Sequence, residues 1–435
     1  MSADEAIGKE GKFDLSTKLL GGAIIGIGIG LFGMLSALTT DGSTLDKAPF
    51  LGWLWGCAFW LSIAIGLLML IMIFRVFNSR WTPVVRRQQE HGLAAFPWLG
   101  LCFAPLLLVA LFGGDKSGIL WGWINSSTQT VGNITVGEDV LLEKKAGYLN
   151  IPFFAFRLIL YFAIFCGLSF LMRKVSFSQD KDGDPKWTHL GMKLSAAGIP
   201  ATALALTFGA FDLFMSLEYQ WFSTMYGVWF FASGIRAALA VTIIGCLYLS
   251  TKGSLKGIYK QAHQYDLACL SLAFTVFWAY VSFSQYFLIY SANIPEETFW
   301  YTIREINPNA GERSGWFWVS MGLIFGPFFF PFLYLLFYRN KIVGPRLIFI
   351  VCWRLVFHLL DLYWNIIPGR EINPGAFIGY EARGVWGTHL FWGLATLVGA
   401  GCLCAWAVLR SFQSKVAEDI PIRDPRILDS INYHE

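Results

Sequence analysis

Residues 50–74 read FLGWLWGCAFWLSIAIGLLMLIMIF, an apolar run of 25 residues with no charged side chain. A transmembrane helix needs about 20 mostly apolar residues to cross a hydrocarbon core of about 30 Å. Together with this run, nine similar segments predict ten membrane spans: 19–38, 50–74, 96–113, 151–172, 194–217, 225–249, 267–291, 316–338, 347–367 and 387–409.

The composition of the whole chain agrees with these spans. Of 435 residues, 55% are apolar and 14% are charged, whereas soluble domains have about 25% charged residues. The sequence therefore predicts an all-α polytopic protein with a single membrane domain, 1–435. The small net charge of +4 is no reason to expect a nucleic-acid partner, and membrane lipid is the expected surrounding.

Lysine and arginine are distributed unevenly between the two sides of the predicted bundle. Of the 33, 22 lie in the N-terminal tail, in alternate loops and in or beside the C-terminal tail, against eight in the other loops. The positive-inside rule then places both tails, 1–18 and 411–435, in the cytoplasm. The C-terminal tail is too polar to be buried alone, and two interpretations stay open for it: a docking arm or a disordered tail.

Residues 28–33 match the pattern GxGxxG but lie inside an apolar helix. The dinucleotide-binding fingerprint needs a strand before it and a βαβ unit around it. Gly22, Gly26 and Gly30 instead predict close packing of the first helix against another helix.

The sequence predicts no metal centre and no covalently bound cofactor. The eight cysteines form no CxxC pair, which argues against a cysteine-ligated cluster or covalent haem. His358 and His389 are the two histidines inside predicted spans. A haem between them is an alternative, although they are expected to lie at different depths.

Five ionisable residues interrupt the apolar runs: Arg157, Arg236, Arg354, Asp212 and Asp361. A charge at the middle of the bilayer costs about 2.5–3.5 kcal/mol on insertion scales, so such residues face the bundle interior and find partners. Buried ion pairs are one explanation. Proton transfer is the other.

The ninth span favours proton transfer. Arg354, His358, Asp361 and Asn365 follow each other at intervals of four, three and four residues, which places them on one helical face. Within that helix the nearest cation candidate for Asp361 is Arg354, two turns away and too far for a tight pair. We therefore predict Asp361, His358 and Arg354 as residues of a proton path.

A similar pattern occurs in the fifth span, where Asp212-Leu-Phe-Met-Ser216 resembles Asp361-Leu-Tyr-Trp-Asn365. Asp212 is therefore a fourth proton-path candidate. The similarity predicts two parallel four-helix bundles, 50–217 (spans 2–5) and 225–367 (spans 6–9), with the first and last spans flanking them.

Polar and aromatic side chains near these residues could also form a quinone pocket. The candidates are Tyr280, Gln285 and Trp364, since amides and hydroxyls can hydrogen-bond a quinone carbonyl and aromatic rings form pocket walls. The alternative is that they are bundle core.

Three stretches carry a resemblance to a known family: GAFDLFMSLEYQWFSTMYGVWFFASG (209–234), FWAYVSFSQYFLIYSANIPEETFWY (277–301) and RLVFHLLDLYWNIIP (354–368). They resemble the F subunit of bacterial alternative complex III, a quinol:cytochrome c oxidoreductase. That subunit is similar to NrfD/polysulfide reductase membrane subunits. The resemblance implies two four-helix bundles with two extra helices in a bacterial inner membrane.

The resemblance also implies partners and a division of labour. The expected partners are an iron–sulfur subunit and multihaem cytochrome subunits, which would carry all haem and clusters, and a related C-type membrane subunit. In the family, a His and Asp pair in the C-type subunit is assigned to the quinol site. Here the first bundle has Asp212 but no intramembrane histidine, which favours a proton-conducting or scaffolding role.

Three functional hypotheses follow. The leading one is a respiratory-complex subunit without its own redox centre that contributes a proton path and a quinone-facing pocket. The alternatives are a secondary transporter and a purely structural membrane scaffold.

Overall fold

The computed structural model describes residues 3–40, 46–125, 130–131, 134–307, 311–372, 380–414 and 418–433. In these ranges ten helical segments are long and apolar enough to cross a membrane, which confirms the predicted number. The spans are α1 (Ala3–Thr39), α2 (Ala48–Val76), α3–η1–α4 (Pro83–Gly92, Leu93–Ala95, Phe96–Phe112), α6 (Ile151–Asp182), α7 (Lys186–Leu213), α8 (Tyr226–Lys252), α9 (Gln261–Ala292), α11–η6–α12 (Gly315–Ile324, Phe325–Phe329, Phe330–Leu336), α14 (Gly344–Ile366) and α15 (Thr388–Gln413).

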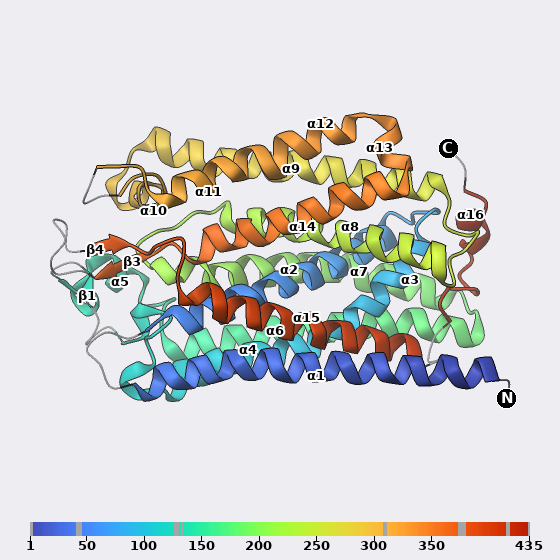
Figure 1. Cartoon of the computed structure of the whole chain (residues 1–435), viewed down its shortest axis with the longest axis horizontal. Coiled ribbons are helices and arrows are strands. Elements are labelled where there is room, and N and C mark those ends of the chain that lie inside the picture. The colour runs from blue at the N-terminus through green and yellow to red at the C-terminus, as the bar shows by residue number, and fades with distance from the viewer. Residues whose placement is uncertain are drawn as a thin grey trace.

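The spans run along one common direction, and both ends of the chain lie at the same end of the bundle (Figure 1). We call this the terminal end and the opposite one the loop end. Short elements cap the loop end: α5 (Val140–Lys145), α10 (Pro295–Glu305), and the antiparallel pairs β1–β2 (Thr130–Val131, Ile134–Thr135) and β3–β4 (Arg370–Ile372, Tyr380–Ala382).

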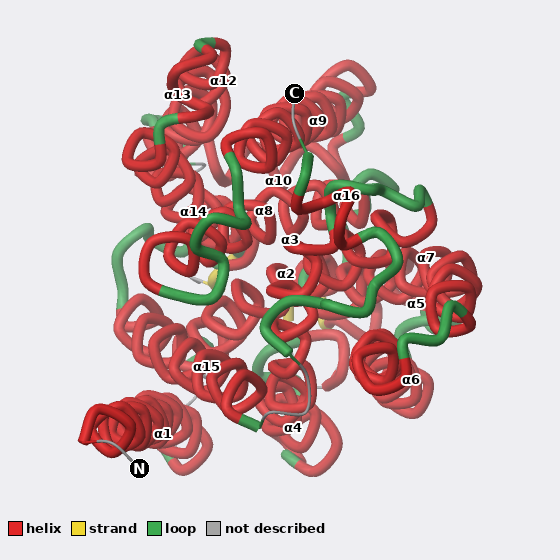
Figure 2. Tube along the Cα trace, turned by 90° about the vertical axis from the view of Figure 1, so that its right-hand side faces the viewer, coloured by secondary structure: helices red, strands yellow, loops and turns green. Residues whose placement is uncertain are grey.

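The spans contact each other both within each predicted set of four and between the two sets. In the first half, α2 contacts α4 and α7, α4 contacts α6, and α6 contacts α7; in the second, α8 contacts α9 and α14, and α12 contacts α9 and α14. The halves meet where α2 packs against α8, near the centre of the end-on view (Figure 2). α15 lies between α1 and α2.

Glycines allow close helix crossings. A Cβ on Gly26 of α1 would lie 2.6 Å from Gly399 Cα of α15, and one on Gly66 of α2 would lie 2.3 Å from the Gly234 carbonyl oxygen of α8. Any side chain there would force the backbones apart. The predicted packing role of Gly26, and of Gly22 and Gly30 beside it, is confirmed, because their added Cβ atoms would all meet α15.

The third span begins earlier than the predicted residue 96. Helix α3 adds Pro83–Gly92, although it carries Arg86, Arg87 and Glu90. These charges are buried and pair with one another: Glu90 lies 3.1 Å from Arg86 and 3.2 Å from Arg87. A hydropathy count scores each of these residues as polar and takes no account of their pairing. It therefore starts the third span too late.

The C-terminal tail docks on the terminal end of its own chain. Asp424 is buried and accepts a hydrogen bond of 2.6 Å from Arg86, and Ser430, in α16 (Ile427–Ile431), donates to the Trp81 carbonyl at 2.7 Å. Burial acts to raise the pKa of Asp424, but the attraction of Arg86 and Arg426 outweighs it and holds the pKa below its usual value. The described tail is therefore a docking arm whose target is this chain.

Candidate functional site

Where the two halves meet, α2, α8 and α14 build a hydrogen-bond network. His358 of α14 has its Nε2 2.8 Å from the Ser62 hydroxyl of α2 and its Nδ1 3.0 Å from the Ser233 hydroxyl of α8. Ser233 also donates to the Asp361 carboxylate at 3.1 Å. All four side chains are buried. We call Ser62, His358, Ser233 and Asp361 the central network.

Asp361 is held mainly by neutral donors. The Trp278 indole N–H of α9 donates to it at 3.0 Å, and Asn365 donates to its Oδ1 at 3.3 Å. Its nearest cation is Arg236 of α8, whose Nη2 lies 3.9 Å from Oδ2 without a hydrogen bond. The partner therefore comes from another helix and is not Arg354, the candidate that the sequence offered.

The central network can hold its protons in two arrangements that differ by one proton. A serine hydroxyl has one proton, and a neutral imidazole donates through one nitrogen and accepts through the other. With Asp361 ionised, Ser62 donates to His358, His358 donates to Ser233, and Ser233 donates to the carboxylate. With Asp361 protonated every bond reverses, and Ser62 donates instead to the Phe59 carbonyl, 2.8 Å away. Reversal of the network would move one proton from the Ser62 end to the Asp361 end.

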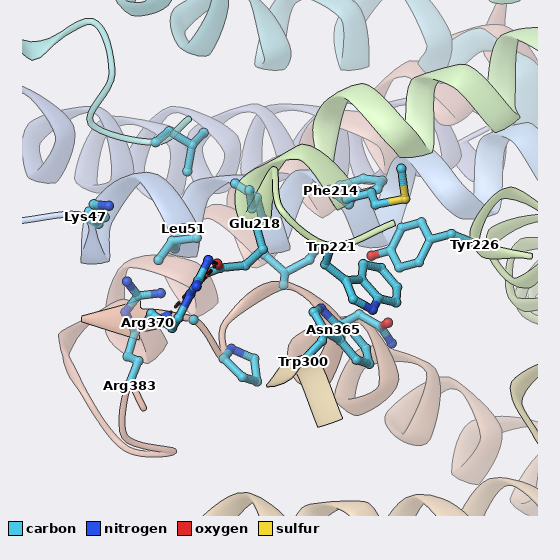
Figure 3. A pocket seen from close by; sticks show the side chains of 16 residues that line it. Lys47, Leu51, Phe214, Glu218, Trp221, Tyr226, Trp300, Asn365, Arg370 and Arg383 are labelled. Atoms are coloured by element: carbon cyan, nitrogen blue, oxygen red, sulfur yellow. Dashed lines mark hydrogen bonds and ion pairs between the residues drawn. The ribbon is translucent and has the colours of Figure 1, made fainter. Parts of the chain in front are cut away.

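At the loop end the network approaches a small cavity through Asn365 (Figure 3). Glu218, Arg370 and Trp300 also line it, and Arg370 and Glu218 form an ion pair of 2.7 Å. The cavity volume is about 30 Å³, enough for about two water molecules and far below the roughly 300–1,000 Å³ of ligand pockets. Its size suits water and not a quinone ring.

In the first bundle Asp212 has different surroundings. Its two carboxylate oxygens accept hydrogen bonds of 2.8 Å from Nε and Nη2 of Arg157, and the Tyr161 hydroxyl donates to it at 2.8 Å. Tyr148 and Phe153 cover the guanidinium, with ring centres 3.8 and 4.3 Å from Arg157 Cζ. This bidentate pair is the arrangement expected of a structural contact.

The three predicted quinone-pocket residues are not brought together. Gln285 is buried and donates to the Tyr301 hydroxyl at 3.3 Å, and the Trp364 ring packs near Tyr301. Tyr280, on the same helix as Gln285, is 64% exposed on the outside of the bundle. Five residues rotate a helix position by about 140° from 3.6 residues per turn, which explains why Tyr280 points elsewhere.

The two histidines of the predicted spans have separate partners. Both ring nitrogens of His358 face serine hydroxyls, and His389 Nε2 lies 2.7 Å from the Tyr363 hydroxyl. This geometry does not present the two imidazoles to one haem iron. Within the described ranges no three His, Cys, Asp or Glu side chains form a set that could hold a metal ion.

Sequence reasoning missed three members of the site: Ser62, Ser233 and Trp278. Each is a single polar group in an apolar run, which is a weak signal. One pattern could have singled out Ser233, because it lies three residues before Arg236 and thus on the same face of α8.

Neither a scan against models of protein families nor a search of curated proteins finds a match for this sequence.

Proposed function

We propose that this chain is a membrane subunit, without a redox centre of its own, of a respiratory quinol:electron-acceptor oxidoreductase in a bacterial inner membrane. Its second bundle would move protons between the terminal end and the loop end. The observation that supports the proton role is the central network, in which a serine joins a buried histidine to a buried carboxylate. The respiratory setting rests on the resemblance of residues 209–234, 277–301 and 354–368 to the alternative complex III subunit.

Three features favour proton exchange at Asp361. The carboxylate is buried at 3% exposure, its donors are neutral, and its one nearby cation makes no hydrogen bond to it. A carboxylate with such partners can gain a proton without breaking a tight ion pair. The nearby cavity would supply water for exchange at the loop end.

The scaffold alternative has one observation in its favour, the Arg157–Asp212 pair. For Asp212 that pair makes a structural role the better proposal. A quinone-facing pocket remains part of the proposal only near Gln285 and Trp364, because Tyr280 points away from them.

The complex is tested by purifying the tagged chain from its own membranes in mild detergent. We expect iron–sulfur and multihaem cytochrome subunits and a second polytopic subunit to copurify, detected by mass spectrometry and by a haem absorption spectrum. A chain that purifies alone would contradict the respiratory setting and favour the transporter alternative.

The proton role is tested in that complex, reconstituted in liposomes, with Asp361→Asn. We expect assembly and quinol oxidation to persist while proton release per electron falls, because asparagine keeps the size but does not titrate. Asp361→Glu should retain proton release, and Asp115→Asn, at an exposed carboxylate of the loop end, is the matched control. Wild-type proton release in Asp361→Asn, or loss of assembly, would favour the scaffold.

A further inference from the structure

Two buried arginines lie beside the central network without hydrogen-bond partners. Arg236 and Arg354 are each 1% exposed, and none of the three guanidinium nitrogens of either residue donates a hydrogen bond to another described group. Buried guanidinium groups almost always donate to oxygen atoms, because an unmet donor carries the full cost of its lost hydration.

The helix geometry places the two arginines at one level of the bundle. α8 and α14 are the sixth and ninth spans and therefore antiparallel, and they meet where Ser233 contacts His358. Arg236 lies three residues beyond Ser233, about 4.5 Å along its helix, and Arg354 lies four residues before His358, about 6 Å along its own. Both displacements point toward the terminal end, so the two side chains start at nearly the same level.

The charge at this level is not balanced by the protein. Arginine stays protonated in proteins, so the pair contributes two positive charges, and Asp361 is the one carboxylate with a described contact to either. The apolar run of α2 and the facing part of α9 have no charged residues. Water could accept hydrogen bonds here, but it cannot neutralise the remaining positive charge.

The neighbouring groups suit a small anion. The Trp278 ring covers Arg236, with its centre 4.1 Å from Cζ, which leaves the nitrogens at the guanidinium edge as donors. Ser271 of α9 has a buried hydroxyl without a described partner and lies two turns before Trp278, toward the terminal end on the same face. The guanidinium edges therefore offer several N–H donors at this level, and the nearest carboxylate, Asp361, lies 3.9 Å from Arg236 and already accepts hydrogen bonds from Ser233 and Trp278.

We propose that Arg236 and Arg354 hold one monovalent inorganic anion of the halide class, chloride in the cell, inside the second bundle. Full burial excludes a lipid phosphate or a peptide carboxylate, whose remaining atoms would need a path to the surface. A single negative charge balances the site when Asp361 is ionised. This inference does not depend on the respiratory setting.

The test is chloride binding to the purified, detergent-solubilised protein. After dialysis into sodium gluconate, radioactive chloride should bind at one ion per chain, and the thermal unfolding midpoint should rise with chloride at constant ionic strength. Arg354→Gln should weaken binding by at least about tenfold, because a hydrogen bond to a charged group contributes more than the energy of a tenfold change. Arg346→Gln, an exposed arginine near the start of the same helix, should bind as the wild type does.

Three outcomes would overturn the proposal: no bound chloride on the wild type, the same unfolding midpoint in chloride and gluconate, or unchanged binding in Arg354→Gln. The first two use the unaltered protein, so they decide the matter even if the variant fails to fold. None measures proton movement, so the result is separate from that of Asp361→Asn.

Discussion

Replacing Asp212 by asparagine will destabilise the protein strongly, because it breaks a buried bidentate ion pair inside the membrane region. The carboxylate accepts three hydrogen bonds of 2.8 Å, two from Arg157 and one from Tyr161, and it is fully buried. Removing one partner of a buried ion pair costs about 3–5 kcal/mol, since the other charge stays behind without compensation. Tyr161→Phe removes one hydrogen bond to a charged group and should cost about 1.5–3 kcal/mol.

A double-mutant cycle separates the pair from the packing around it. The free energy of unfolding is measured by denaturant titration in detergent for Asp212→Asn, Arg157→Met and the double variant. In the double variant neither charge remains, so its cost should fall short of the sum of the single costs by about 0.5–3 kcal/mol. Asp115→Asn, at an exposed carboxylate, should change stability by less than about 0.5 kcal/mol. Additive single costs, or a cost for Asp212→Asn as small as that control, would refute the structural assignment.

Four further predictions concern other parts of the molecule. Gly26→Val should lower the melting temperature by separating α1 from α15, whereas Gly28→Val should not, because its added Cβ meets nothing within 4 Å. Ser233→Ala should reduce proton release per electron in the reconstituted complex although Asp361 remains, and wild-type release would exclude the serine from the path. Asp424 has a lowered pKa, so its contribution to docking should be complete above about pH 4 and lost as the pH falls further, measured with a fluorophore on the tail. Alkaline phosphatase fused at residues 130 and 300, at the loop end, should be active. Fusions at residues 185 and 425, at the terminal end, should be inactive. The reverse pattern would contradict the topology.

The number of the spans could be predicted because it depends on properties local in the sequence. A long apolar run such as 50–74 is stable only inside the membrane, away from water. Glycines four residues apart mark a helix face that can approach another helix closely. The prediction failed at 83–95, where the charges of α3 are buried against one another and against Asp424. The sequence around Arg86 contains no signal that Asp424, 338 positions later in the C-terminal tail, will pair with it.

The sequence predicted which face of α14 carries the site, but not which residues of other helices contact that face. Periodicity correctly placed His358 and Asp361 on one side of α14, yet the groups that contact them come from α2, α8 and α9. Which residue meets Asp361 depends on how those helices rotate and slide when they pack, and the sequence of one helix does not contain that information. Arg236 was recognised as an intramembrane charge, whereas its position beside Asp361 follows from the packing of α8 against α14.

The two halves show how one motif can serve two purposes. Each has an aspartate followed four residues later by a small polar side chain that bonds back to the aspartate's backbone oxygen, Ser216 at 2.6 Å and Asn365 at 2.8 Å. The difference is the donor: Arg157 forms a bidentate contact with Asp212, whereas Asp361 has a serine, an indole and an arginine too distant to hydrogen-bond. Protonation of Asp212 would break the ion pair, but protonation of Asp361 only reverses the hydrogen bonds of the central network. The contacts of Asp212 are therefore those of a structural ion pair, whereas those of Asp361 are compatible with the proton exchange that we propose.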